Sequence, residues 1–410
     1  MGRNGAAIRH GRDRGGPRWA RLLRTALAVV VVCAVAGVSL AAITAWRLTA
    51  QLQGNAVDIT NGKSASAPSI GAFSGAFTVL LVGEDNSSGQ SGFGTSRAAT
   101  LNDVNIVVHV NADHSSATVV SVPRDLVIDQ PQCTDPTTQQ VYAPVSAQPL
   151  NTAIARGGLG CVVATVEQQT GLTIPYAALF SFEGTVAMAD AVGGVQVCAT
   201  KAIDDPYSGL KLPAGTSTIT GRTALAYLRS RHGVGDGSDL GRIASQQAYM
   251  SSLLRKMTSS STLTNPATLY ALASAAAKNV VLSKSLADVN TMVTMMLALK
   301  QISLSKIAFV QYPTTPDPAD PNKVVPDTTL ATALMSRVKS GQAIPLSRSN
   351  LGTSAVIAKT PAGSAPASSS APTPRPTSSS STSSSSSTSA LNGLKGQTAS
   401  ERTCSVAASS

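Results

Sequence analysis

Apolar residues along this chain form one long segment followed by several short runs that polar connections separate. The long segment covers residues 25–46. The short runs at 77–83, 104–110 and 117–122 have the length and valine-rich composition of buried strands. A glycine ends the first short run, and the turn-forming sequence NADHSS joins the other two. The pattern therefore predicts a sheet that starts near residue 77.

Helical periodicity follows these strands and alternates with further strands. Helices are predicted at 160–171, 181–194, 220–228, 239–257, 266–278 and 285–299, and strands at 194–200 and 306–313. Gly171 is expected just after the first helix, because glycine adopts the left-handed conformation that often ends helices. Alternating strands and helices are typical of an α/β layered domain.

Composition divides the chain into six regions. We expect an arginine-rich cytoplasmic tail, a transmembrane helix, a small-residue stalk, an external folded domain, a domain edge or linker, and a disordered tail. These cover residues 1–24, 25–46, 47–72, 73–315, 316–349 and 350–410, respectively. The last region is rich in serine, proline and threonine, and such a segment buries too little apolar surface to fold.

The net charge of +11 is concentrated at the N-terminus, where residues 1–24 hold seven arginines and one acidic residue. No basic stripe with interleaved aromatic residues follows, which argues against a nucleic-acid partner. Arginines before an apolar segment of about 20 residues instead indicate one membrane span. The tail would lie in the cytoplasm and everything after Arg47 outside. A cleaved secretory signal is the alternative, but its apolar region is shorter, about 7–15 residues.

Five cysteines fit an oxidising compartment outside the membrane. Cys33 lies in the apolar segment, and the other four follow it. We predict a disulfide between Cys133 and Cys161, which flank the segment that joins the third strand to the next helix. Cys198 can pair with Cys404 only if the C-terminal tail folds back. No C-x-x-C motif is present, which disfavours a zinc ribbon or a thioredoxin-like site.

The stretch AYLRSRHGVGDGSDLGRIASQQ gathers positive charge in a chain with only 13% charged residues. If LRSR is extended, Arg229 and Arg231 point to one face. Asp239 suits the N-cap of the next helix, and Arg242 and Gln246 share one face of it. Helix N-termini favour anions, and guanidinium groups bind phosphate bidentately. The stretch therefore predicts a pyrophosphate site, with ordinary solvated arginines as the alternative.

Charged residues also flank the predicted strands. Arg124 and Asp125 follow the third strand in the sequence VSVPRD, at the carboxyl end where α/β sheets bind ligands. Glu84 and Asp85 follow the first strand, and Asp103 precedes the second. Carboxylates near phosphates are the usual magnesium ligands, so these residues predict a Mg²⁺ site. A local ion pair and ordinary turn chemistry are the alternatives.

Motifs of several other enzyme classes are missing from the sequence. It contains no G-x-S-x-G elbow, no H-E-x-x-H and no Walker A motif. His109 lies within a predicted strand and is expected to pack there. His232 is next to the arginines, but a single histidine is weak evidence for catalysis. A serine-hydrolase triad therefore lacks support.

Several motifs, taken in chain order, resemble the LytR–CpsA–Psr family over about residues 75–257. They are FTVLLVGED, LNDVNIVVHVNADHSSATVVSVPRD, LNTAIARGG, FEGTVAMADAVGGVQV and LPAGTSTITGRTALAYLRSRHGVGDGSDLGRIASQQ. The resemblance implies a central mixed sheet flanked by helices in a membrane-anchored phosphotransferase of the cell envelope. Such an enzyme moves a glycopolymer from a polyprenyl (pyro)phosphate carrier onto peptidoglycan and forms a phosphodiester.

The resemblance also implies roles for individual residues. Asp85 and Asp103 match magnesium-binding aspartates, Arg124 matches a catalytic arginine, and Asp103 is a second catalytic candidate that helps to deprotonate the acceptor hydroxyl. The pyrophosphate-binding set matches Arg229, Arg231, Arg242 and Gln246, with Asp239 as its acidic partner.

One position departs from the family pattern. Leu101 stands two residues before Asp103, where the family often has an arginine, and Arg97 is the nearest substitute in the sequence. The departure keeps open a regulatory protein that binds polyprenyl phosphates without turnover. A hydrolase of the same lipids, with water as acceptor, is a further alternative.

Overall fold

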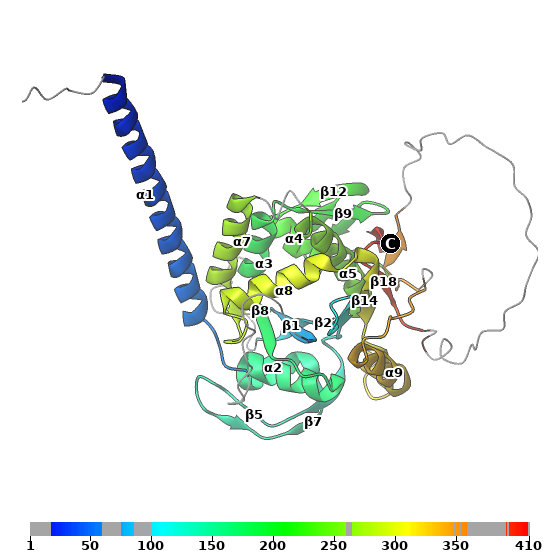
Figure 1. Cartoon of the computed structure of the whole chain (residues 1–410). Helices are drawn as coiled ribbons and strands as arrows, with labels where there is room; N and C mark the ends of the chain where they lie inside the picture. Colours follow the sequence, from blue (N-terminus) through cyan, green and yellow to red (C-terminus); the bar gives the residue numbers. More distant parts are fainter. Residues whose placement is uncertain are drawn as a thin grey trace, which may run out of the picture. The chain divides into compact units, whose positions relative to one another are not determined.

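The computed structural model divides into two units, Met1–Ala50 and Gln51–Ser410 (Figure 1). The residues that it describes are 18–59, 75–85, 100–259, 265–347, 350–352, 354–358, 391 and 393–408. Most of helix α1 (Arg18–Gly54) belongs to the first unit and contains the apolar segment 25–46. Within the described ranges, no helix combines the length and the apolar character that a membrane crossing requires.

A seven-stranded sheet forms the centre of the second unit, in the order β13-β8-β1-β2-β3-β14-β18. Its strands are β1 (Phe77–Glu84), β2 (Asn102–Val110), β3 (Ala117–Ser121), β8 (Tyr176–Phe180), β13 (Val280–Leu282), β14 (Ile307–Gln311) and β18 (Gly396–Thr398). The pairs β1–β8 and β3–β14 are parallel, and the remaining neighbours are antiparallel. The predicted α/β fold with a central mixed sheet is therefore confirmed.

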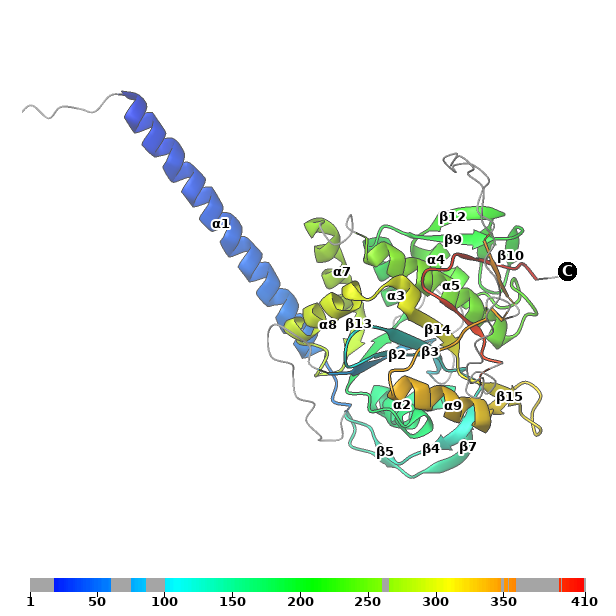
Figure 2. The same ribbon diagram turned by 45° about the vertical axis from the view of Figure 1, so that its right-hand side comes forward.

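Helices α2 (Ile154–Thr170) and α9 (Thr328–Lys339) cover one face of this sheet (Figure 2). Valine and leucine side chains of β1, β2, β3 and β14 pack there against both helices. Gly171 ends α2 with φ of 61°, as expected for a left-handed helix terminus. Leu334 and Val338 of α9 are almost fully buried in the same core, so this helix is part of the domain.

The opposite face carries a second layer of helices. They are α3 (Phe182–Ala191), α4 (Gly221–Arg229), α5 (Asp239–Met257), α7 (Pro266–Asn279) and α8 (Val289–Gln301). A four-stranded sheet in the order β12-β9-β19-β17 packs against α5. Its strands are β12 (Gly215–Ile219), β9 (Val195–Ala199), β19 (Thr403–Ser405) and β17 (Ala355–Ile357).

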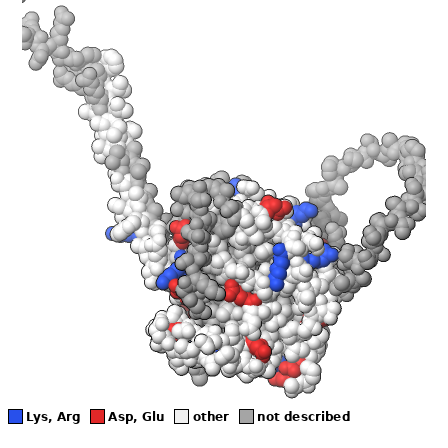
Figure 3. Space-filling view, turned by 60° about the horizontal axis from the view of Figure 1, so that its bottom comes forward, with Lys and Arg blue, Asp and Glu red and all other residues white. Residues whose placement is uncertain are grey.

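Short strands and 3-10 turns complete the described elements. The two-stranded pairs are β4 (Val127–Gln130) with β7 (Val145–Pro149), β5 (Cys133–Thr134) with β6 (Val141–Tyr142), β10 (Ile203–Asp205) with β11 (Leu210–Leu212), and β15 (Thr314–Pro316) with β16 (Val324–Pro326). The turns are η1 (Leu150–Thr152) and η2 (Leu304–Lys306). On the face in Figure 3, lysine and arginine side chains are scattered and form no continuous basic stripe (Figure 3).

Three of the predicted boundaries are wrong. Segment 316–349 is not merely an edge or linker, because α9 buries its apolar side in the main core. Segment 47–72 is not a stalk throughout, because Ile59 is buried and Val57 donates a backbone hydrogen bond to Leu282 O at 2.8 Å. Residues 60–72 of that segment lie outside the described residues, as does most of tail 1–24.

The C-terminal region 350–410 is the third correction, because strands β17, β18 and β19 lie within it. Strand β18 pairs with β14, so β18 and not the predicted strand 306–313 forms this edge of the central sheet. A Cβ atom on Gly396 would lie 2.1 Å from the carbonyl oxygen of Phe309, so glycine permits this close pairing. Residues 359–390, on which the disorder prediction also falls, lie outside the described residues.

Two disulfides occur in the domain. The predicted Cys133–Cys161 bond is present and joins β5 to α2. A Cys198–Cys404 bond links β9 to β19 across 206 residues of sequence. The condition set for this second bond, that the tail folds back, is therefore met.

Candidate active site

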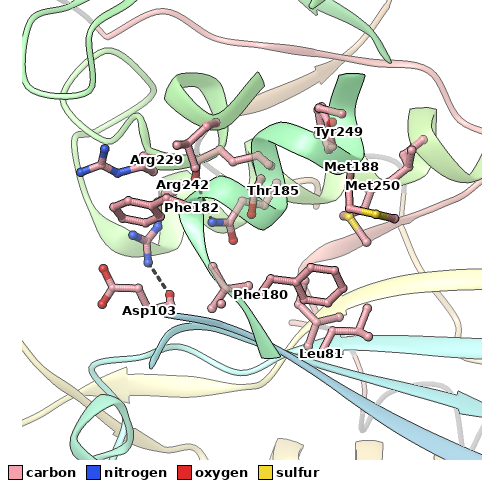
Figure 4. Close-up of a pocket in the computed structure, with 18 of the residues that line it drawn as sticks. Leu81, Asp103, Phe180, Phe182, Thr185, Met188, Arg229, Arg242, Tyr249 and Met250 are labelled. Carbon is pink, nitrogen blue, oxygen red and sulfur yellow. Dashed lines mark hydrogen bonds between the residues drawn. The ribbon is translucent and has the colours of Figure 1, made fainter. Parts of the chain in front are cut away.

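A cavity of about 430 Å³ lies between the central sheet and helices α3, α4 and α5 (Figure 4). Its inner wall is apolar, with Leu81 and Phe180 from the sheet facing Met188, Tyr249 and Met250 from the helices. Further lining side chains are Val82, Ile106, Val192, Leu225, Leu228, Leu253, Met257 and Leu272. Such a wall suits a hydrocarbon ligand, because apolar surface gains free energy when it leaves water.

Charged side chains gather at one end of this apolar cavity. Its lining includes Glu84, Asp103, Arg124, Asp205, Arg229, Arg231, His232, Arg242 and Gln246. The arginines come from three separate places in the fold: the loop after β3, the C-terminal end of α4 with the loop that follows, and the first turn of α5. The fold therefore combines one apolar chamber with one polar, arginine-rich end.

Arg124 is the centre of a network of ion pairs. Its guanidinium contacts Asp103 at 2.8 Å, Asp239 at 3.2 Å and Asp125 at 3.3 Å. Burial alone would lower the pKa of Arg124, but the three carboxylates outweigh it and raise that pKa well above its usual value. Arg124 is therefore a permanent, fixed positive charge, with only 13% of its side chain exposed.

Arg242 lies deeper than Arg124 and shares its partner Asp239, which it contacts at 2.6 Å. Its Nη2 also donates to the backbone carbonyl of Asp103 at 3.0 Å, the interaction drawn in Figure 4. Burial lowers the pKa of Arg242 in spite of the opposing carboxylate of Asp239. A bound anion beside Arg242 would stabilise its charged form.

Several buried polar atoms in the described part of the site have no hydrogen-bond partner. They include Asp103 Oδ1, Arg231 Nε and Arg242 Nε. A buried polar atom without a partner costs about 1–3 kcal/mol, so a cluster of them indicates a missing polar ligand. Both carboxylate oxygens of Asp239 also lack a hydrogen-bond partner, although Oδ1 forms ion pairs with Arg124 and Arg242. The two N–H donors suit an anion such as a phosphate, and the carboxylate oxygens suit a cation bound with it.

The loop between α4 and α5 differs in detail from the sequence prediction. Arg229 is the last residue of α4 rather than part of an extended LRSR segment, and its guanidinium stacks on the ring of Phe182 at 4.3 Å. Ser238, not Asp239, is the N-cap of α5, because its hydroxyl accepts the Gly241 N–H. Asp239 is thereby free to turn toward Arg124 and Arg242.

Gln246 lies in the cavity wall one turn beyond Arg242. Its side-chain amide donates to Leu228 O at 2.9 Å, which ties α5 to the end of α4. The residue therefore holds the two arginine-bearing helices together as well as lining the site.

Asp85 is not brought into the cavity wall. Its Oδ1 accepts the Leu101 backbone N–H at 3.0 Å, and Glu84 lines the cavity instead. The physical reason is an irregularity in the β1–β2 pairing at Gly83 and Glu84, which interrupts the strand alternation. Arg97, the proposed substitute for an arginine at Leu101, lies outside the described residues.

Sequence reasoning missed Tyr207 at the cavity mouth, noted His232 beside the arginines without giving it a role, and could not separate an apolar cavity lining from core packing. Tyr207 and His232 both line the cavity and contact each other through their rings. The lining residues carry no signal, because an apolar side chain in a cavity wall has the same pattern as one in a core. Tyr207 follows Pro206 in a polar turn, where an isolated aromatic residue was a usable signal. His109, by contrast, packs as expected, with its Nδ1 3.0 Å from Thr78 Oγ1.

Comparison with known proteins gives a consistent family. Residues 46–340 match the LytR_cpsA_psr family model. The cell wall biosynthesis protein LcpA of Corynebacterium glutamicum is 37% identical over 238 residues, covering 52% of this chain and 46% of LcpA. A polyisoprenyl-teichoic acid–peptidoglycan teichoic acid transferase, TagU of Bacillus cereus, is 31% identical over 46% of this chain and 54% of TagU. The chain thus spans about half the length of these curated relatives.

The fold also matches solved structures. The crystal structure of B. subtilis TagV superposes with a TM-score of 0.51 and 21% sequence identity, over 65% of this chain and 97% of TagV. At that level of identity the similarity concerns the fold alone.

Proposed function

This chain belongs to the LytR_cpsA_psr family, and from that premise we propose that it is a glycopolymer–peptidoglycan phosphotransferase. It would take a glycopolymer from a polyprenyl (pyro)phosphate carrier and attach it to a peptidoglycan hydroxyl through a phosphodiester. The observation that carries the proposal is the cavity, which combines an apolar chamber with an arginine-rich end. A polyprenyl phosphate matches this cavity, because it consists of a long hydrocarbon chain with a negatively charged phosphate at one end.

Different residues would bind the substrate, stabilise the transition state and accept the proton in the proposed reaction. Arg229, Arg231 and Arg242 would bind the pyrophosphate, and Arg124 would stabilise the charge that develops on the transferring phosphoryl group. The acceptor oxygen forms a bond to phosphorus while the bond to the polyprenyl phosphate breaks, and the polyprenyl phosphate leaves. The hydroxyl proton would pass to the carboxylate of Asp103, which lines the cavity beside Arg124.

The test is an incubation of the full chain, in detergent, with a lipid-linked oligosaccharide and a peptidoglycan fragment. Mass spectrometry should detect the oligosaccharide joined to the fragment through one phosphate. Release of the oligosaccharide phosphate into water alone would mean a hydrolase. Lipid binding without any product would mean a regulatory protein, and either result would contradict the transferase.

A magnesium ion is part of the proposal. In the described residues no group of three or more His, Cys, Asp or Glu side chains is arranged to hold a metal. Mg²⁺ commonly uses one or two carboxylates together with substrate phosphates. The Oδ1 of Asp103, which has no hydrogen-bond partner, fits such a ligand. Asp85 is the second candidate, because it directly follows β1, the strand next to β2, and its backbone N–H donates to Leu101 O at 3.0 Å. The ion would neutralise phosphate charge.

Asp103→Asn is expected to raise the Mg²⁺ concentration for half-maximal activity by about tenfold or more, because a metal ligand is weakened. A Mg²⁺ titration of the transfer rate measures this. Asp113→Asn, in an exposed turn, is the control and should leave the titration unchanged. A lower maximal rate with the same Mg²⁺ midpoint would remove Asp103 from the metal site.

Arg231→Ala is expected to weaken binding of a polyprenyl pyrophosphate by about ten- to a hundredfold, because a hydrogen bond to a charged group contributes roughly 1.5–3 kcal/mol. Lysine at this position should restore only part of the affinity, since it lacks the bidentate fork. Calorimetric titration measures the change. Arg222→Ala, at the exposed start of α4, is the matched control. Equal losses in both variants would mean a general charge effect rather than a site.

We also propose an external location, with residues 1–24 in the cytoplasm. The arginine-rich tail before the apolar segment supports this orientation, and the two disulfides support an oxidising compartment. An alkaline phosphatase fused after Ser410 should be active in cells, because that enzyme folds only outside the cytoplasm. An inactive fusion beside an active cytoplasmic reporter at the same position would reverse the orientation.

A further inference from the structure

Tyr207 is an exposed aromatic residue at the mouth of the cavity. It lies in the turn between β10 and β11, and 78% of its surface is accessible to water. It is nevertheless part of the cavity lining, together with Ser208 of the same turn. No other large hydrophobic side chain in the described part of the chain has a greater exposed fraction. An aromatic ring left in water beside a ligand cavity suggests a ring that a ligand covers.

His232 supports the ring of Tyr207 from the arginine side. The two ring centroids are 4.4 Å apart with an angle of 44° between the planes. His232 is exposed, also lines the cavity, and directly follows Arg231. Tyr207 and His232 thus form a small aromatic surface beside the arginines proposed to bind phosphate. We call it the aromatic shelf.

Asp205 fixes the shelf relative to the arginine loop. This carboxylate is 1% exposed and accepts four hydrogen bonds. Its Oδ1 accepts the N–H groups of Tyr207 at 3.0 Å and Ser208 at 3.3 Å. Its Oδ2 accepts the hydroxyl of Ser230 at 2.6 Å and the N–H of Gly233 at 3.2 Å. One buried side chain therefore joins the turn that carries Tyr207 to the loop that carries Arg231 and His232.

The chemistry around the shelf favours a sugar over a lipid surface. Asp204 and Lys211, on the same hairpin, have 69% and 84% of their side chains exposed, and such charges are costly to place in hydrocarbon. The face of an aromatic ring carries partial negative charge, which attracts the weakly positive C–H groups on one face of a pyranose. A ring held beside phosphate-binding arginines is therefore placed for the sugar bonded to that phosphate.

We propose that Tyr207 and His232 form a binding subsite for the first sugar of the donor, the pyranose bonded directly to the pyrophosphate. The inference rests on the proposed function, because it requires the pyrophosphate to lie at the arginines. The subsite would make binding selective for the donor sugar. The aromatic shelf favours a sugar ring with an uninterrupted apolar C–H face, whereas the arginines contact only the phosphates.

Two soluble ligands separate the sugar from the phosphate: farnesyl pyrophosphate, and the same pyrophosphate with N-acetylglucosamine as its terminal sugar. The full chain should bind the sugar-bearing ligand more tightly. Tyr207→Ala should reduce that preference roughly three- to tenfold and leave farnesyl pyrophosphate binding within twofold of wild type. Tyr207→Phe should keep the preference, because the ring face makes the contact. Tyr270→Ala is the control, since Tyr270 is 53% exposed on α7 and is not among the cavity-lining residues.

Other outcomes would overturn the inference. An equal loss for both ligands in Tyr207→Ala would mean that the turn only supports the arginine loop. Unchanged binding of both ligands, with a raised KM for the peptidoglycan fragment, would place the acceptor at the shelf. A wild-type chain that binds farnesyl pyrophosphate but gains nothing from the sugar would refute the subsite and leave the proposed function intact. A chain that binds neither ligand would refute both.

Discussion

Arg124→Ala is expected to lower the rate of glycopolymer transfer by roughly 100- to 1000-fold while lipid binding falls far less. The reason is that a fixed positive charge at the phosphoryl group acts mainly on charge that develops in the transition state, where one such donor contributes about that factor. Arg124 is suited to this role, because three carboxylates keep it charged and hold it in place. Single-turnover rates and lipid affinities, measured on the same preparation, give the comparison.

The same substitution also removes the partner of buried carboxylates. Breaking a buried ion pair on one side costs about 3–5 kcal/mol, so the melting temperature must be measured beside the rate. Arg124→Lys keeps the charge and most of the stability but loses the two-pronged geometry. We expect it to fold and to remain well below the wild-type rate. Full activity in a folded Arg124→Ala protein would exclude this arginine from the mechanism. Equal losses of binding and rate would make it an anchor for the substrate.

Removal of residues 391–410 is expected to abolish the cooperative unfolding transition of the domain. The deletion takes away β18 and β19, the buried side chains of Leu391 and Leu394, and the partner of Cys198. Each buried leucine contributes about 1.5–3 kcal/mol. A disulfide that closes so long a loop contributes about 5 kcal/mol by the chain-entropy estimate. Their combined loss is comparable to the whole free energy of unfolding of an ordinary domain.

Thermal unfolding by circular dichroism measures this result. The matched control keeps the length of the chain and permutes the order of residues 361–390, whose composition is mainly serine, proline, threonine and alanine. We expect the control to melt like the wild type. A truncated protein that melts cooperatively within a few degrees of the wild type would show that the C-terminal strands are dispensable.

Strong local patterns made much of the fold predictable. Strands β1, β2 and β3 were found from uninterrupted apolar runs, and α5 from a long periodic segment of predicted and observed bounds 239–257. Helix α9 also had a signal, because Asp327 caps it and Leu334 and Val338 repeat at helical spacing. Strands β18 and β19 had none. They are short, polar and distant in sequence from the strands that hold them, so only tertiary pairing defines them.

The candidate site was likewise predictable only in part. Charged residues are scarce in this chain, so the arginines of the α4–α5 region and Arg124 stood out in the sequence, and the fold brings them to one cavity. Asp85 was predicted as a site residue but does not line the cavity, because the sequence does not reveal the irregular pairing of β1 with β2. The prediction that LRSR is extended was wrong, because helix α4 continues through Arg229. The shelf residue Tyr207 depends on a contact with His232 that no local pattern reveals.

The return of the C-terminus into both sheets has a consequence for the timing of folding. Strand β18 forms one edge of the central sheet, and β19 lies between β9 and β17 in the smaller one. Both strands follow every other described strand of the two sheets in the sequence, so neither sheet can be completed before residues 396–405 have left the ribosome. Until then the outer edge of β14 exposes unpaired backbone groups, which favour aggregation. The nascent chain therefore passes through a vulnerable interval, during which a chaperone that masks this edge would raise the yield of folded protein.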